Sequence, residues 1–169
     1  MNEILWPKGY LPGETDNFAS NEIIVKGLTA EEVWIYLDNT LEWAKYYTNA
    51  SDIHFYNTLG PKLSAEARFR FVTFGLTVEA EVVEYVPPKD GKPARIAWHG
   101  WCEGMEEEKL DVHHAWLIEN LEGGRVRILT QETQNGIPAK NMAVEKPNPM
   151  INAHQDWIEG LAKAAKSRI

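Results

Sequence analysis

Hydrophobic and polar positions along the chain switch between a two-residue and a 3.6-residue period, and this switch separates strands from helices. Residues 21–26 alternate between apolar and charged side chains, as in a half-buried strand. A capping box of Thr29 and Glu32 opens a helix, and a second short helix is expected at 41–47. Between residues 52 and 134, turn signals separate about six further strands. These are expected at 53–56, 68–73, 76–82, 94–101, 110–121 and 125–134.

The last third of the chain combines a polar strand with a long amphipathic helix. The polar strand, 130–134, runs through an Asn135-Gly136 turn toward the helix, which Pro147 and Pro149 interrupt before its straight portion. Its apolar stripe contains a histidine among large hydrophobic residues, at the spacing of one helical face. The stripe consists of Met150, Ile151, His154, Trp157, Ile158, Leu161 and Ala165. The histidine is therefore expected to point inward.

The order of these elements predicts an α+β fold with one domain. A strand, two short helices, about six antiparallel strands and one long helix give a curved sheet of about seven strands wrapped around the C-terminal helix. Residues 1–19 are rich in proline, glycine and aromatic side chains and predict an irregular N-terminal arm. Residues 20–169 form the domain itself. A sheet wrapped around one helix leaves room for a pocket between them.

Composition and charge narrow the classes of function. The chain has 169 residues, of which 44% are apolar, and a net charge of −8, which opposes binding to nucleic acid. Seven Trp, six Tyr and five Phe exceed the needs of a minimal core and suggest that rings enclose a ligand. We expect no secretion signal and no membrane span. The single cysteine, Cys102, favours a cytoplasmic protein. We expect the protein to be either a monomer or a homodimer.

The strand–helix–helix–strands–helix order over residues 20–168 resembles that of the START-related helix-grip superfamily, also called SRPBCC. This superfamily includes polyketide cyclases and dehydrases, lipid-transport proteins and activators of the Hsp90 ATPase. Several local segments resemble a bacterial branch of it. They are Trp6-Pro7 with Asp16-Asn17-Phe18, Ala115–Ile118, Leu129–Gln134, and Pro149-Met150 followed by His154–Trp157. The resemblance implies a helix-grip fold with a hydrophobic pocket, and it transfers no catalytic residue because fold does not fix function.

Strand parity predicts which side chains face the pocket. With Arg125 and Arg127 in water, the alternate residues of the last strand turn inward, and Asp111 and Glu119 orient the preceding strand in the same way. The expected lining is mostly aromatic and aliphatic, with a few convergent polar groups, as in small-molecule sites. The residues expected to bind a ligand are Phe69, Phe71, Val78, Trp98, His114, Trp116, Thr130, Gln134, Met150 and Trp157.

Glu132 and His154 are the candidate catalytic residues. Desolvation should raise the pKa of an inward carboxyl unless a cation pairs with it, and His154 or His114 could be that cation. Such a pair could exchange a proton during an aldol-type cyclisation or a dehydration. In the competing interpretation, Glu132 caps backbone amides at the mouth of the pocket and the histidine is a hydrogen-bonded core residue.

Neither a metal nor a cofactor is expected. His113 and His114 are adjacent on a strand and point to opposite faces, so both cannot bind one ion, and Asp111 lies on the side of His113. Cys102 has no neighbouring basic residue that would lower its pKa, and is expected to be an ordinary residue at a strand end.

Three functions remain as hypotheses. The first is a carrier or sensor that binds a small hydrophobic or aromatic ligand in the pocket. The second is an enzyme of the cyclase or dehydratase type that uses Glu132 and His154 as an acid–base pair. The third is an interaction protein, like the Hsp90 activators, whose working surface includes the aromatic N-terminal arm. The mixture of apolar and polar residues in the predicted lining favours the first two.

Overall fold

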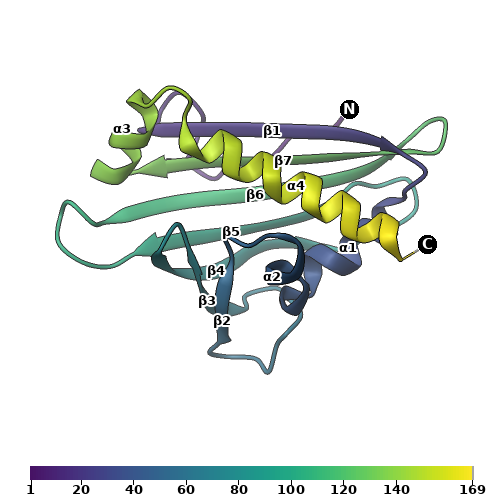
Figure 1. The fold of residues 1–169 in the computed structure, drawn as a ribbon, viewed down its shortest axis with the longest axis horizontal. Helices are drawn as coiled ribbons and strands as arrows, with labels where there is room; N and C mark the ends of the chain where they lie inside the picture. Colours follow the sequence, from purple (N-terminus) through teal and green to yellow (C-terminus); the bar gives the residue numbers. More distant parts are fainter. Residues whose placement is uncertain (169) are drawn as a thin grey trace.

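The structure, a computed structural model, describes residues 1–168 and contains a seven-stranded antiparallel sheet that curves around a long C-terminal helix (Figure 1). The strands lie in the order β1-β7-β6-β5-β4-β3-β2. The predicted α+β helix-grip architecture is confirmed. The elements are β1 Asn17–Lys26, α1 Ala30–Asp38, a 3-10 turn Thr40–Glu42, α2 Trp43–Tyr46, β2 Ser51–Phe55, β3 Arg68–Thr73, β4 Leu76–Val86, β5 Ala94–Cys102, β6 Leu110–Leu121, β7 Arg125–Asn135, α3 Ile137–Val144 and α4 Pro149–Ser167.

The helices begin where the sequence places their caps. Thr29 accepts a hydrogen bond from the backbone N–H of Glu32, and the Glu32 carboxylate accepts one from the backbone N–H of Thr29, which starts α1. Asn148 caps α4 by accepting from the backbone N–H of Met150, with Pro149 at the first helical position. The expected interruption at the prolines separates α3 from α4. α4 then crosses the inner face of the sheet (Figure 1).

β1 is longer than its hydrophobic alternation suggests, because it begins at Asn17 rather than at residue 21. Asn17 pairs with Gln134 of β7, and its side-chain Nδ2 donates to Gln134 Oε1 over 2.8 Å. A buried amide that bonds to another amide satisfies both groups and leaves no apolar signature in the sequence. The strand therefore extends across the boundary expected at residue 20.

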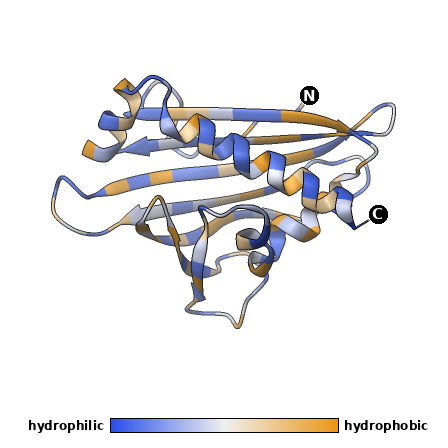
Figure 2. Ribbon diagram, in the orientation of Figure 1, coloured by the Kyte–Doolittle hydropathy of each residue, from blue (hydrophilic) through white to orange (hydrophobic). Residues whose placement is uncertain are grey.

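The middle strands of the sheet are buried on both faces. Hydropathy alternates along the strands (Figure 2), and the inner face forms the main core with α1, α2 and α4. On the outer face the N-terminal arm covers a second, smaller cluster. Its buried members are Ile4, Ala97, Ala115, Leu117 and Leu129, with Trp6 packed against them. The arm is thus part of the fold.

This cover corrects one prediction. Arg127 and Glu119 point outward as expected, but they do not lie in water, since they are only 8% and 6% exposed. The Arg127 guanidinium donates to Glu119 over 2.9 Å, to Glu22 over 2.7 Å and to the backbone carbonyl of Asn2. Their burial follows from the arm, whose position strand parity does not reveal.

Within residues 1–168, the helices are too short or too polar to cross a membrane.

Candidate ligand-binding site

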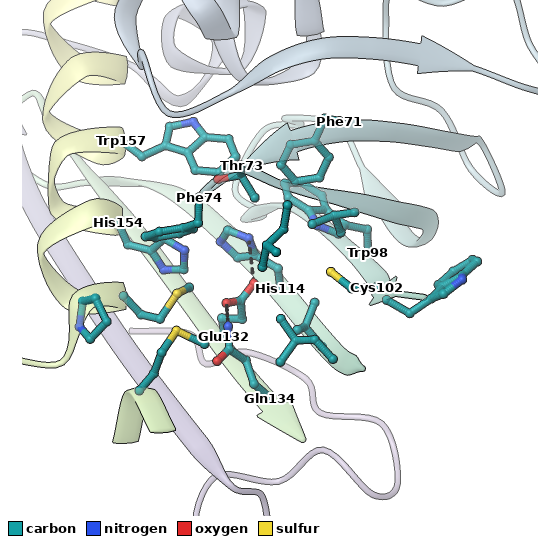
Figure 3. Close-up of a pocket in the computed structure, with 18 of the residues that line it drawn as sticks. Phe71, Thr73, Phe74, Trp98, Cys102, His114, Glu132, Gln134, His154 and Trp157 are labelled. Carbon is teal, nitrogen blue, oxygen red and sulfur yellow. Dashed lines mark hydrogen bonds and ion pairs between the residues drawn. The ribbon is translucent and has the colours of Figure 1, made fainter. Parts of the chain in front are cut away.

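A cavity of about 300 Å³ lies between the inner face of the sheet and α4. Its walls come from β3 to β7, from α3 and from the first turns of α4 (Figure 3). Of the residues predicted to bind a ligand, those that line it are Phe71, Val78, Trp98, His114, Gln134, Met150 and Trp157. Both candidate catalytic residues, Glu132 and His154, also line it. Phe69, Trp116 and Thr130 are fully buried behind the lining rather than in it.

The apolar part of the lining is held by one tryptophan that sequence reasoning did not single out. Trp43, in α2, is fully buried and contacts Phe71, Trp98 and Trp157, with ring centroids 5.2–5.6 Å apart. Its indole N–H donates to the backbone carbonyl of Leu37 over 2.8 Å, which fixes the ring. These aromatic contacts give the pocket a rigid wall. The apolar residues of a helix this short carry too weak a periodic signal to identify Trp43 beforehand.

Three ionisable side chains converge at the polar end of the cavity: His114 from β6, Glu132 from β7 and His154 from α4 (Figure 3). Each offers a donor atom, and these atoms all lie within 4.8 Å of one another. The His114 Nδ1 atom is 3.4 Å from Glu132 Oε1. The two imidazole rings stack with centroids 4.5 Å apart and planes 14° from parallel. All three side chains are buried.

A chain of side-chain amides leads from the start of α4 to Glu132. Asn148 donates to Asn17, Asn17 donates to Gln134, and Gln134 donates to Glu132 Oε2 over 2.6 Å. The other oxygen of the carboxyl group faces His114. Because each amide both donates and accepts, the chain fixes the orientation of Glu132 through three neighbours.

Burial favours the neutral forms of all three groups. Desolvation raises the pKa of Glu132 to about 8, against the lowering effect of the hydrogen bond from Gln134. Desolvation also lowers the pKa of His154 to about 4, and it holds the pKa of His114 well below its usual range, with the neighbouring His154 adding to the effect. Neither imidazole is therefore the cation considered from the sequence. The contact between His114 and Glu132 joins two neutral groups at neutral pH.

Cys102 lines the same cavity, at the end of β5. Burial, reinforced by the nearby Glu132 carboxyl, raises its pKa to about 11, so the side chain is a neutral thiol. Strand parity could have found it, because Cys102 shares the inward face of β5 with Trp98.

The other histidines of these strands lie on the outer face, as predicted. His113 packs against Trp6 and Tyr10 of the arm, and His99 lies 2.6 Å from the Asp111 carboxylate. His113 and His114 thus point to opposite sides of β6, and only His114 reaches the cavity.

Solved structures share this fold. The chain is 50% identical to hypothetical protein jhp0584 from Helicobacter pylori, with a TM-score of 0.93 over 98% of this chain and 97% of that one. It also superposes on norcoclaurine synthase from Thalictrum flavum, with a TM-score of 0.63 at 9% identity over 88% of this chain and 92% of that one. A third similar structure is the di-domain ARO/CYC BexL, with a TM-score of 0.57 at 12% identity over 86% of this chain and 44% of that one. No protein-family model and no curated protein matches the chain.

Proposed function

We propose that this chain, which has the helix-grip fold of norcoclaurine synthase and the ARO/CYC protein, is a carrier or sensor. Its ligand would be a small hydrophobic or aromatic molecule bound between the sheet and α4. The observation that carries the proposal is a cavity with aromatic walls and one polar end. Rings such as Trp98 and Trp157 bury the apolar body of the ligand, while Glu132, His114 and Gln134 bond to its polar end.

The size of the cavity limits the ligand. At about 300 Å³, the cavity lies at the lower end of the range of about 300–1,000 Å³ that is common for small-molecule sites. It suits a compact molecule with one or two rings better than a long acyl chain. The ligand needs a hydroxyl, carbonyl or similar polar atom, because an apolar group placed against the buried polar side chains would leave them without hydrogen-bond partners.

Native mass spectrometry of the freshly purified full chain tests this proposal. We expect a non-covalent adduct that is lost on denaturation and whose mass identifies the ligand. Val78→Phe fills the cavity and should abolish the adduct, whereas Val83→Phe on the same strand, at a position 55% exposed, should retain it.

If the freshly purified chain carries no adduct, the same pair of variants can be compared with an added apolar probe, 1-anilinonaphthalene-8-sulfonate, by fluorescence. Binding that Val78→Phe leaves unchanged would contradict the pocket as the binding site. Thermal unfolding of both variants confirms that they are folded.

A second candidate function is an acid–base enzyme of the cyclase or dehydratase type that uses Glu132 and His154. The supporting observation is that a carboxyl and two imidazoles meet at the polar end of the cavity, where they can reach one bound molecule. The names of norcoclaurine synthase and of the ARO/CYC protein show that this fold hosts enzymes.

Glu132→Gln distinguishes the two functions, because the amide keeps the shape of the side chain but exchanges no proton. A carrier should bind its ligand almost unchanged, within about threefold, since the aromatic walls supply most of the contact. An enzyme should keep its binding and lose turnover by about 100-fold or more. The ligand identified by mass spectrometry serves as the substrate, and its conversion is followed by chromatography.

A further inference from the structure

The polar end of the cavity has the donor set of a metal centre. We propose that His114, Glu132 and His154 bind a divalent first-row transition metal ion, such as Zn²⁺ or Fe²⁺, with an open coordination position that faces the cavity. The proposal goes beyond the binding of an organic ligand and does not rest on it. The sequence predicted no metal site because only residues that lie close together along the chain were compared. These three donors instead come from β6, β7 and α4.

The distances suit a metal of this size. Two donors that bind Zn²⁺ at about 2.1 Å with tetrahedral geometry lie about 3.4 Å apart. His114 Nδ1 and Glu132 Oε1 lie 3.4 Å apart, so two of the three donors are already in position. The ring of His154 lies beside them (Figure 3), with its donor atom within 4.8 Å. Because this ring stacks on that of His114, His154 must rotate about its side-chain bonds to direct a nitrogen lone pair at the same ion.

The hydrogen bonds of His114 direct a lone pair toward Glu132. The Thr130 hydroxyl lies 3.1 Å from the backbone carbonyl of Ala115, to which it can donate its single proton. With the proton placed there, the hydroxyl oxygen, 2.8 Å from His114 Nε2, accepts the Nε2–H. The neutral imidazole is then unprotonated at Nδ1, the atom that faces Glu132. This tautomer is the one that binds a metal through Nδ1.

The surrounding groups act as an outer shell. Metal-bound histidines usually donate their second ring N–H to an oxygen, as His114 does to Thr130. Metal-bound carboxylates are usually held by a further hydrogen bond, as Gln134 holds the Oε2 atom of Glu132. The amide chain that begins at Asn148 extends this support to the start of α4.

His154 provides an independent observation. Its side chain is 3% exposed, and its Nδ1 atom is buried with no hydrogen-bond partner in the part of the chain that the structure describes. Buried polar atoms are nearly always bonded, and this imidazole lines the cavity beside two other donors, where a bound ion or a water molecule could supply the missing partner. A cation between the three side chains would compensate the burial of this imidazole and of Glu132 together.

The fourth position of the ion opens onto the cavity. Three protein donors and one open position are typical of catalytic metal sites, in contrast to closed structural ones. A water molecule, or an oxygen atom of a small ligand, would complete the coordination. The apolar walls would then hold the remainder of that ligand beside the ion.

Zinc binding to the full-length protein, after treatment with EDTA and removal of the chelator, tests the proposal. Isothermal titration with Zn²⁺ should show one equivalent bound, and Co²⁺ should give visible d–d absorption bands from a site with nitrogen and oxygen ligands. Glu132→Gln and His154→Gln should each weaken Zn²⁺ binding by more than about 100-fold, since even outer-shell partners contribute about 10- to 100-fold.

His113→Gln is the matched control. It removes an imidazole from β6, the strand of His114, but on the face of the sheet opposite the cavity. It should leave the affinity for Zn²⁺ unchanged. Absence of stoichiometric binding, or equal losses in His113→Gln and His154→Gln, would overturn the proposal. Circular dichroism and thermal unfolding in EDTA establish that each variant is folded, and a Zn²⁺-dependent rise in the Tm of the unmodified protein gives a readout without substitution.

The proposal of a metal site and the proposal of an organic ligand can be tested separately. Val78→Phe blocks the apolar part of the cavity and should retain the zinc site, since Val78 is not among the three donors.

Discussion

Gly160, in the middle of α4, packs directly against the backbone carbonyl of Tyr46 at the end of α2. A β-carbon at residue 160 would clash with that oxygen and would also lie 3.2 Å from the Tyr46 ring. The contact is between a helix that covers the cavity and the helix that carries Trp43. Glycine therefore sets how closely α4 approaches the aromatic wall of the pocket.

Gly160→Ala should destabilise the protein by about 1–3 kcal/mol, because α4 or α2 must move to admit the methyl group. Helix propensity alone predicts the opposite sign, since alanine is favoured over glycine by about 1 kcal/mol in a helix. Urea unfolding of Gly160→Ala decides between the two. Asn152→Ala, at an exposed position of the same helix, should stabilise the protein by no more than about 0.7 kcal/mol, which is the gain from helix propensity alone. A stabilised Gly160→Ala would show that the two helices are not held in contact.

Thr130 and Thr133, both fully buried in β7, should respond in opposite ways to replacement by valine. Thr130→Val leaves the His114 Nε2–H without its acceptor and should cost about 1–3 kcal/mol of unfolding free energy. The Thr133 hydroxyl has no hydrogen-bond partner within residues 1–168, so Thr133→Val should be neutral or stabilising.

The same two variants probe the metal site. Thr130 acts as a positioning residue through His114, so Thr130→Val should weaken Zn²⁺ binding by about 10- to 100-fold, and Thr133→Val should not. Chemical unfolding and zinc titration, each done on both variants, measure the two effects. Equal behaviour of the two variants would contradict the tautomer assigned to His114.

Glu119 should make stability fall in acid. Burial by itself raises the pKa of this carboxyl, but hydrogen bonds from Asn2 and Arg127 outweigh it and hold the pKa below the usual 4.5. A pKa that is lower in the folded state contributes stability that is present above pH 4.5 and is lost as the pH falls through the folded-state pKa.

Glu119→Gln should remove this part of the pH dependence, and it should cost about 1–3 kcal/mol at pH 7 because Arg127 loses a buried partner. Urea unfolding between about pH 3 and pH 7 gives the comparison. Glu122→Gln, an exposed neighbour, is the control and should follow the unmodified protein. If the stability of Glu119→Gln falls in acid as steeply as that of the unmodified protein, the loss of stability comes from other carboxyl groups.

The N-terminal arm should contribute to stability through a few buried side chains. Ile4 is 7% exposed and packs in the outer cluster, so Ile4→Ala should cost about 2–4 kcal/mol. The adjacent Leu5 is 61% exposed, and Leu5→Ala should cost less than about 0.5 kcal/mol. Thermal unfolding ranks the two. Similar, small effects would mean that the arm does not stay on the sheet in solution.

Strand parity was the most productive signal in the sequence. Placing Arg125 and Arg127 on the outer face correctly predicted that Glu132 and Gln134 face the cavity. The prediction holds because side chains alternate between the two faces along a strand that has no bulge. Parity did not show that Arg127 itself is buried. Whether an outward residue meets water depends on what covers it, and here the cover comes from a segment more than a hundred positions away.

The sequence also did not reveal which inward-facing side chains line the cavity and which are covered by others. Phe69 and Phe71 share a strand face, yet only Phe71 lines the cavity. In the same way, Trp116 lies behind the lining and Trp98 within it. Alternation gives the side of the sheet, but the position of α4 and of Trp43 determines which inward side chains are covered by others. Ile151, placed on the apolar stripe of the helix, is 42% exposed.

The pairing of β1 with β7 has a consequence for how the protein is made. Asn17 and its partner Gln134 are 117 positions apart, so a ribosome that adds about 5–20 residues per second adds Gln134 about 6–23 seconds after Asn17. During that interval Ile23 and Val25 have neither a neighbouring strand nor α4 against them. An unpaired, half-apolar strand is a template for association with other chains. The nascent polypeptide should therefore depend on chaperones until its last elements emerge.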